Sequence, residues 1–123
     1  MLVLDTNAII YRLAGEAAVS NLIITKVLEG EELVVPATSV VEFLSFPKIS
    51  DLEISRFNIF LGQTRVAALD LPLAQMAGRL RKDYRMSLGD SVVAATALSF
   101  RATLVTRNVK DFKKVRGLKL LSI

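Results

Sequence analysis

Four acidic residues stand near the starts of helices expected from the sequence: Asp5, Glu42, Asp90 and Asp111. The chain has no His and no Cys, so it lacks an imidazole base, a thiolate nucleophile and the side chains that zinc prefers. Carboxylate oxygens suit hard cations such as Mg²⁺ or Mn²⁺, and a bound cation offsets the repulsion between clustered carboxylates. These acids therefore predict magnesium-type chemistry.

Short apolar runs alternate along the chain with segments of helical periodicity. Strands are expected at Met1–Asp5, Leu33–Pro36, Arg65–Leu69, Leu104–Thr106 and Leu118–Ile123. Helices are expected over about 6–14, 17–29, 37–46, 50–62, 71–84 and 87–101, with a helical turn at 108–114. The strand runs are continuously apolar, which is typical of a parallel sheet covered by helices on both faces. We predict one domain over residues 1–123, an α/β fold with three α/β/α layers and a central, mainly parallel sheet.

The expected topology predicts where the acids meet. Functional groups of open parallel sheets collect beyond the carboxyl ends of the strands, where the following helices begin. Asp5, Glu42 and Asp111 each come after an expected strand, and Asp90 lies in the opening turn of a helix rich in small residues. We therefore expect the acids to converge on one edge of the sheet.

Helix capping is the competing explanation for the same residues. Asp5 is a good N-cap, and three pairs have the spacing of a capping box: Ser39–Glu42, Ser87–Asp90 and Asn108–Asp111. Ser50–Glu53 has this spacing without a preceding strand, and we interpret it as a plain cap. The other acids lie in strongly apolar sequence, where an unpaired buried carboxylate is costly, and this favours a site that binds an ion.

The ordered motifs resemble a PIN-domain ribonuclease over nearly the whole chain. They are Leu4–Asn7, Pro36 with Ser39–Phe43, Ser87–Ala97, and Leu104–Asn108 followed by Asp111 and Phe112. The small single-domain form is similar to the toxin of a VapBC-type toxin–antitoxin pair. The resemblance implies that Asp5, Glu42 and Asp90 are an acidic triad holding Mg²⁺ or Mn²⁺, Glu42 either directly or through water.

Other parts of the resemblance concern the residues around the triad. A fourth acid often follows the Thr-Arg pair of the family, whereas this chain has Asn108 there and Asp111 three residues later. Whether Asp111 takes that place, and whether one or two ions bind, stays open. Thr6 and Thr106 match positions where a hydroxyl orients the carboxylates or metal-bound waters.

The resemblance implies a metal-dependent endoribonuclease that hydrolyses RNA phosphodiester bonds and acts as the toxin of a type II pair. It further implies a small antitoxin protein as inhibitor, and a homodimer. Residues 8–30 and 40–61 are rich in large apolar side chains, which suits either a large core or such interfaces.

Charge is distributed unevenly. Residues 1–70 carry five Lys or Arg against nine Asp or Glu, and residues 71–123 carry eleven against three, within a net charge of +4. A basic half indicates either a polyanionic partner, above all nucleic acid, or a surface kept charged for solubility. The candidate phosphate-binding residues are Arg79, Arg81, Lys82, Arg85, Arg107, Lys110, Lys113 and Lys114.

Three alternatives stay open at this stage. One is a PIN nuclease of RNA processing that is not a toxin, and another is a non-catalytic α/β module that binds a partner through its basic face. The third, a phosphoryl-transfer domain with Asp5 as nucleophile, is disfavoured because Asn7 stands where a second acid is needed. The N-terminus has no basic-then-apolar leader and no apolar run approaches ~18 residues, so we expect a soluble, cytoplasmic protein without a membrane partner.

Overall fold

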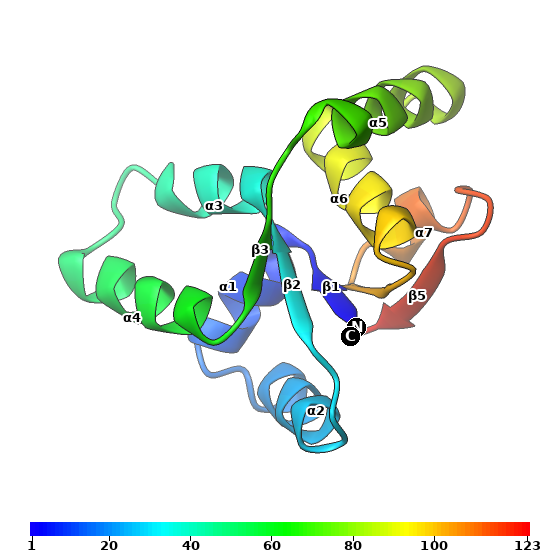
Figure 1. The fold of residues 1–123 in the computed structure, drawn as a ribbon. Coiled ribbons are helices and arrows are strands. Elements are labelled where there is room, and N and C mark those ends of the chain that lie inside the picture. Colours follow the sequence, from blue (N-terminus) through cyan, green and yellow to red (C-terminus); the bar gives the residue numbers. More distant parts are fainter.

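A five-stranded parallel sheet runs through the middle of the computed structural model, in the order β3-β2-β1-β4-β5 (Figure 1). The strands are β1 (Leu2–Leu4), β2 (Leu33–Pro36), β3 (Arg65–Ala67), β4 (Thr103–Thr106) and β5 (Lys119–Ser122). Seven helices connect them: α1 (Thr6–Leu13), α2 (Ala17–Leu28), α3 (Ala37–Leu44), α4 (Asp51–Gly62), α5 (Leu71–Tyr84), α6 (Leu88–Ser99) and α7 (Val109–Phe112). The predicted parallel α/β architecture is confirmed.

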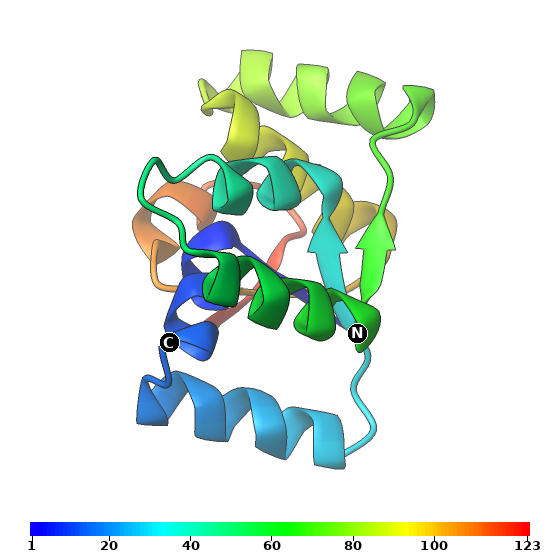
Figure 2. The ribbon, with the colours of Figure 1, turned by 90° about the vertical axis from the view of Figure 1, so that its left-hand side faces the viewer.

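Two hydrophobic cores lie on opposite faces of the sheet, because successive strand residues point to opposite sides. Leu2 and Leu4 of β1 contribute to the core under α1 to α4, together with Phe57 of α4. Val3 of β1 contributes to the other core, which α6 and α7 cover. Figure 1 shows α5, α6 and α7 on one side of the sheet, and Figure 2 shows α3 and α4 in front of it, with α2 below. The molecule thus has the three predicted layers.

The strand order places three helix starts side by side. β1 is the central strand, with β2 on one side and β4 on the other, and Val3 is in register with Val34 and Leu104. Because all three strands run in the same direction, the segments that follow them leave the same edge of the sheet. These segments are the starts of α1, α3 and α7.

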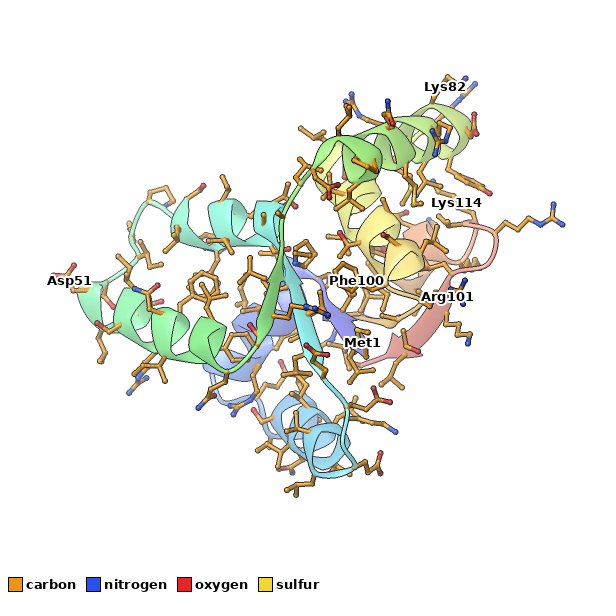
Figure 3. The ribbon with its side chains drawn as sticks, viewed as in Figure 1. Met1, Asp51, Lys82, Phe100, Arg101 and Lys114 are labelled. Carbon is orange, nitrogen blue, oxygen red and sulfur yellow. The ribbon has the colours of Figure 1, made fainter.

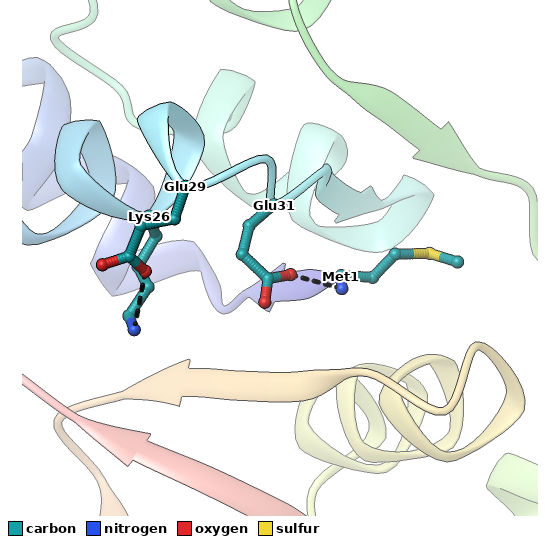
Figure 4. Close-up of polar contacts among 4 residues, drawn as sticks. All are labelled: Met1, Lys26, Glu29 and Glu31. Atoms are coloured by element: carbon teal, nitrogen blue, oxygen red, sulfur yellow. Dashed lines mark hydrogen bonds and ion pairs between the residues drawn. The ribbon is translucent and has the colours of Figure 1, made fainter.

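The first strand is anchored from its first residue. The N-terminal amine of Met1 forms an ion pair with Glu31 at 2.5 Å, close to a second pair between Lys26 and Glu29 (Figure 4). The backbone carbonyl of Met1 also accepts a hydrogen bond from the N–H of Thr103 at 3.1 Å. These contacts fix the residue that precedes β1 beside the beginnings of β2 and β4.

The helices begin within one residue of the expected positions, but not every start is capped as the sequence suggests. The Ser50–Glu53 capping box is complete, with the Ser50 hydroxyl accepting from the Glu53 N–H and the Glu53 carboxylate accepting from the Ser50 N–H. The capping explanation for Ser39 and Glu42 is wrong, because α3 begins directly after Pro36 and the buried Ser39 hydroxyl has no partner. Strand β3 ends at Ala67, short of the expected Leu69, because its partner β2 ends opposite it at Pro36.

No single helix is both long enough and apolar enough to cross a membrane. Helices α1 and α2 satisfy length and composition only when taken together, and they are bent by 103° relative to each other.

Candidate active site

A cavity of about 420 Å³ opens at the carboxyl end of the central strand, and we call it the acidic cavity. Asp5, Glu42 and Asp90 line it, so the structure brings together three acids that are far apart in the sequence. The other lining residues are Thr6, Asn7, Val41, Ser45, Phe46, Gly89, Val93, Asn108 and Phe112. Asp111 and Thr106 do not line the cavity but contact residues that do.

Asp5 is held on both carboxylate oxygens. Its Oδ1 accepts a hydrogen bond from the N–H of Ala8 at 2.7 Å and so caps α1, while its Oδ2 accepts from the Thr106 hydroxyl at 2.6 Å. Thr106 is fully buried and lies 101 residues away in the sequence, at the end of β4. Asp5 therefore caps a helix and is also fixed by the neighbouring strand, which capping alone does not require.

Glu42 lies on α3 and reaches toward the first turns of two other helices. Its Oε2 accepts a hydrogen bond from the Thr6 hydroxyl of α1 at 3.2 Å. Its Oε1 lies against Gly89, only 2.6 Å from the point where a Cβ would stand on that residue. Because Gly89 directly precedes Asp90, the Glu42 carboxylate is held between the element that begins after Asp5 and the one that carries Asp90.

Asp90 is the third residue of α6, and its backbone N–H donates to the Ser87 hydroxyl at 3.1 Å. Asp111 accepts a hydrogen bond from the Asn108 side-chain amide at 2.8 Å, and the backbone N–H of Asn108 donates to the Thr106 hydroxyl at 3.0 Å. Asn108 thus connects Asp111 to the same threonine that holds Asp5. Its side chain does not cap α7.

The electrostatics of the acidic cavity are unfavourable for charged carboxylates. Burial raises the pKa of Asp5, hydrogen bonds from Thr106 and Ala8 oppose this, and the charge of Asp90 raises it further. Burial also raises the pKa of Asp90, with a contribution from Asp111, while the Ser87 hydroxyl and the charge of Lys114 act in the opposite direction. None of the four ion pairs in the chain includes an acid of this group. Apart from this long-range effect of Lys114, the protein's own cations do not compensate the negative charge.

The donor set fits a hard divalent ion in its chemistry. Every candidate ligand is an oxygen, and a divalent cation would favour the charged carboxylates against the burial, and the smaller repulsion, that raise the pKa values of Asp5 and Asp90. No three acidic side chains stand close enough, in the positions they occupy here, to be direct ligands of one ion. Ligation by the whole group would therefore need rotation of side chains or water between a carboxylate and the ion.

The serine caps of α4 and α6 differ in how the acid at the third helix position is used. Glu53 and Asp90 are both the third residue of a helix that begins after a serine cap. In α4 the acid completes a reciprocal box, with the Glu53 carboxylate bonded to the backbone N–H of Ser50. In α6 the backbone N–H of Asp90 donates to the Ser87 hydroxyl, but no reciprocal box with the backbone N–H of Ser87 is formed. The carboxylate of Asp90 instead lines the acidic cavity.

The basic candidates fall into two groups. Arg107 is engaged by the protein itself, since its guanidinium bonds to Glu16 at 2.5 Å and stacks 4.1 Å above the Tyr11 ring. The other seven candidates are exposed and form no ion pair: Arg79, Arg81, Lys82, Arg85, Lys110, Lys113 and Lys114. Figure 3 shows Lys82 at the outer end of α5 and Lys114 beside α7, with Asp51 on the far side of the molecule.

Sequence reasoning missed several residues of the acidic cavity. Gly89 belongs to the Ser87–Ala97 motif, and a glycine directly before an acid at a helix start is an available signal for a site residue. Asn7 belongs to the Leu4–Asn7 motif, but its type alone does not predict that it lines the cavity. Ser45 and Phe46 enter the cavity from the end of α3, and no local sequence signal indicates that.

The comparison with known families decides the assignment. The profile of the PIN domain matches residues 2–118 of the 123. The chain belongs to the PIN-domain family. This PIN domain is 29% identical to Ribonuclease VapC19 of Mycobacterium tuberculosis over 117 residues, covering 91% of this chain and 92% of the relative. It is 31% identical to Ribonuclease VapC1 of Rickettsia felis, covering 89% of this chain and 78% of the relative.

A solved structure shares the fold closely. This PIN domain superposes on a chain of VapBC2 from Rickettsia felis, bound to a DNA fragment from its promoter, with a TM-score of 0.85 and 22% identity. The match covers 99% of this chain and 98% of that chain. The likeness confirms the PIN-like α/β/α fold.

Proposed function

We propose that this PIN domain is a metal-dependent endoribonuclease and the toxin component of a type II toxin–antitoxin pair. One observation carries the proposal: Asp5, Glu42 and Asp90 line a single cavity in which the pKa values of Asp5 and Asp90 stay raised, and none of the three acids forms an ion pair with a cation of the protein. The relatives named above are ribonucleases, which supports this activity over the non-catalytic module.

Asp5, Glu42 and Asp90 would hold Mg²⁺ or Mn²⁺, directly or through water, with Asp111 and Asn108 at the edge. The bound ion would lower the pKa of a water nucleophile and stabilise charge on the phosphoryl oxygens. The hydroxyl of Thr106 fixes the orientation of Asp5 at 2.6 Å. Thr6 does the same for Glu42 at 3.2 Å, so both threonines act by positioning carboxylates.

The substrate would be bound through its phosphates. Exposed lysines and arginines at the end of α5 and around α7 can neutralise phosphates without reading sequence. The charge of Lys114 already reaches Asp90, so at least one cation of this group lies near the acidic cavity. Arg107 is a weaker candidate, because a phosphate would have to compete with Glu16.

A second cavity offers a place for the antitoxin. This apolar groove of about 740 Å³ is lined by Ile10, Leu13, Ala14, Phe43, Phe46, Pro47, Lys48, Ile49, Glu53 and Arg56. Phe46 also lines the acidic cavity, so the two hollows adjoin. We infer that an apolar segment of a small antitoxin protein lies in this groove and reaches the acids from there, as amphipathic segments do in other grooves.

A homodimer is the proposed oligomeric state. Large apolar side chains are exposed on α3 and at the starts of α5 and α6, including Val41 at 66%, Leu71 at 70% and Leu88 at 64%. Exposed apolar patches of this kind are typical of subunit interfaces. Light scattering at micromolar concentration tests it: wild type should have twice the mass of the chain and Val41→Glu should be monomeric, whereas a monomeric wild type contradicts the proposal.

Cleavage of purified RNA tests the activity. Wild-type protein should cut RNA with Mg²⁺ or Mn²⁺ and not with EDTA, and Asp90→Asn should be inactive while remaining folded by circular dichroism. A non-catalytic module would cut nothing under any condition. For the toxin assignment, induced expression should arrest growth in a manner that depends on Asp90. Cleavage without growth arrest would favour a nuclease of RNA processing.

A further inference from the structure

Gly89 makes an unusually close approach to the acidic cavity. A Cβ on this residue would stand 2.6 Å from Oε1 of Glu42 and 3.5 Å from its Cδ, and no atom of another residue is among its nearest neighbours. Side-chain Cβ atoms do not approach other heavy atoms below 3.0 Å, so a side chain at this position and the present place of the Glu42 carboxylate exclude each other.

The backbone gives no other reason for glycine here. Gly89 is the second residue of α6 and is not among the glycines with positive φ, so any L-residue could adopt its conformation. Glycine is otherwise disfavoured in helices because it loses more backbone entropy than alanine does. The missing side chain is therefore explained by what it leaves room for, the carboxylate of Glu42.

We propose that Gly89 is a positioning residue that lets the Glu42 carboxylate lie against the first turn of α6, beside Asp90. This inference rests on the proposed metal-dependent nuclease. Glu42 is the only one of the three acids that comes from an exposed helix surface, and its one hydrogen bond is to Thr6 at 3.2 Å. The space over Gly89 and the Thr6 hydroxyl together define where its carboxylate stands.

An alanine at position 89 would displace that carboxylate. Oε1 would have to withdraw by at least about 0.4 Å to restore a 3.0 Å contact, away from the turn that carries Asp90. Changes that misplace a metal ligand without removing it cost roughly 10–100-fold in metal affinity or activity. Gly89→Ala should therefore weaken the metal site although it adds a good helix former.

Gly78 provides the matched control. It lies within α5, has ordinary helical φ and would place a Cβ within 4 Å of nothing. Gly78→Ala should keep full activity and metal response and should raise Tm modestly, because it removes the entropic cost of glycine and creates no clash. It thus measures what the glycine-to-alanine change does to a helix of this protein apart from Glu42.

The experiment measures Mn²⁺-induced thermal stabilisation and RNA cleavage for wild type, Gly78→Ala, Gly89→Ala, Glu42→Ala and the Glu42→Ala/Gly89→Ala double variant. We expect Gly89→Ala to lose about tenfold in Mn²⁺ affinity and to show about half of the wild-type Tm rise at 100 times the wild-type Kd. The double variant should match Glu42→Ala in affinity and cleavage, because Gly89 acts only through the carboxylate that is absent.

The outcomes separate this inference from the function on which it rests. A wild type with neither a Mn²⁺ response nor cleavage overturns both proposals. If wild type responds, the positioning role is overturned by a Gly89→Ala variant that behaves like Gly78→Ala, or by losses that add to those of Glu42→Ala. If Gly89→Ala does not fold, the double variant must recover the Tm of Glu42→Ala. Failure to recover it means that the clash lies elsewhere and overturns the role.

Discussion

Replacing Asp90 by Asn, which exchanges one carboxylate oxygen for an amide nitrogen, separates ion binding from helix capping. The cap of α6 uses the Ser87 hydroxyl and the backbone N–H of residue 90, at 3.1 Å, and asparagine retains both. The substitution removes a negative charge near a helix N-terminus, which costs roughly 0.3–1 kcal/mol. It also removes a charge that burial and Asp111 disfavour, which acts in the opposite direction. Without metal, the variant should therefore be about as stable as wild type.

The difference should emerge when metal is added. A ligand at 100 times its Kd stabilises a protein by about 2.7 kcal/mol. For a domain of 123 residues, 1 kcal/mol corresponds to about 4 °C in Tm, so Mn²⁺ at that concentration should raise the wild-type Tm by about 11 °C. If Asp90→Asn binds 100-fold more weakly, the same concentration only equals its Kd and should raise Tm by roughly 2 °C.

Glu53→Gln is the matched control, because Glu53 occupies the same third position of α4 after a serine cap. It should lose the same helix-dipole contribution and keep the full Mn²⁺ response. Differential scanning fluorimetry with and without 100 Kd of Mn²⁺, together with RNA cleavage, measures both effects. An Asp90→Asn protein that retains the 11 °C rise and the cleavage would refute the assignment of Asp90 to an ion site.

Three further outcomes follow from the same geometry. In metal-free protein the folded-state pKa values of Asp5 and Asp90 are raised, so these groups contribute to the free energy of unfolding below the ordinary pKa of 3.8 and lose that contribution as pH rises through the raised values. In urea melts, the stability of Asp90→Asn relative to wild type should therefore increase with pH. A constant difference across that range would contradict this. Thr106→Val removes the 2.6 Å hydrogen bond to buried Asp5, and should cost about 1–3 kcal/mol in urea melts and lower cleavage; an unchanged melt would show that Asp5 does not need this partner. If Lys82 contacts a phosphate, Lys82→Gln should reduce the slope of log K against log salt for RNA binding by about one unit. The control Lys26→Gln, on α2 beside Glu29, should leave the slope unchanged. Equal slopes in wild type and both variants would identify Lys82 as ordinary surface charge.

Local sequence signals were sufficient for the architecture. A continuously apolar run such as Leu33–Pro36 can bury its side chains on both faces only in a sheet that helices cover on both sides. A parallel three-layer fold therefore follows from hydrophobic pattern and spacing. Helix starts were predictable both where a cap is local, as at Ser50, and at α3, which begins at Ala37 as expected, but the capping partner was not predictable at α3, where the helix begins after Pro36 without a side-chain cap. The end of β3 depended on its partner β2 and could not be read from β3 itself.

By itself, the sequence determined which chemistry was available and roughly where it would gather. A chain without His and Cys leaves oxygen ligands, and parallel strands bring the residues that follow them to one edge. Only the tertiary structure decided how each acid is held there. The Thr106 hydroxyl on Asp5, the space over Gly89 for Glu42 and the engagement of Arg107 by Glu16 all join residues that are 47 to 101 positions apart in the sequence. Such contacts depend on how strands and helices pack against each other, and that packing is a property of the whole chain that no local window of sequence contains.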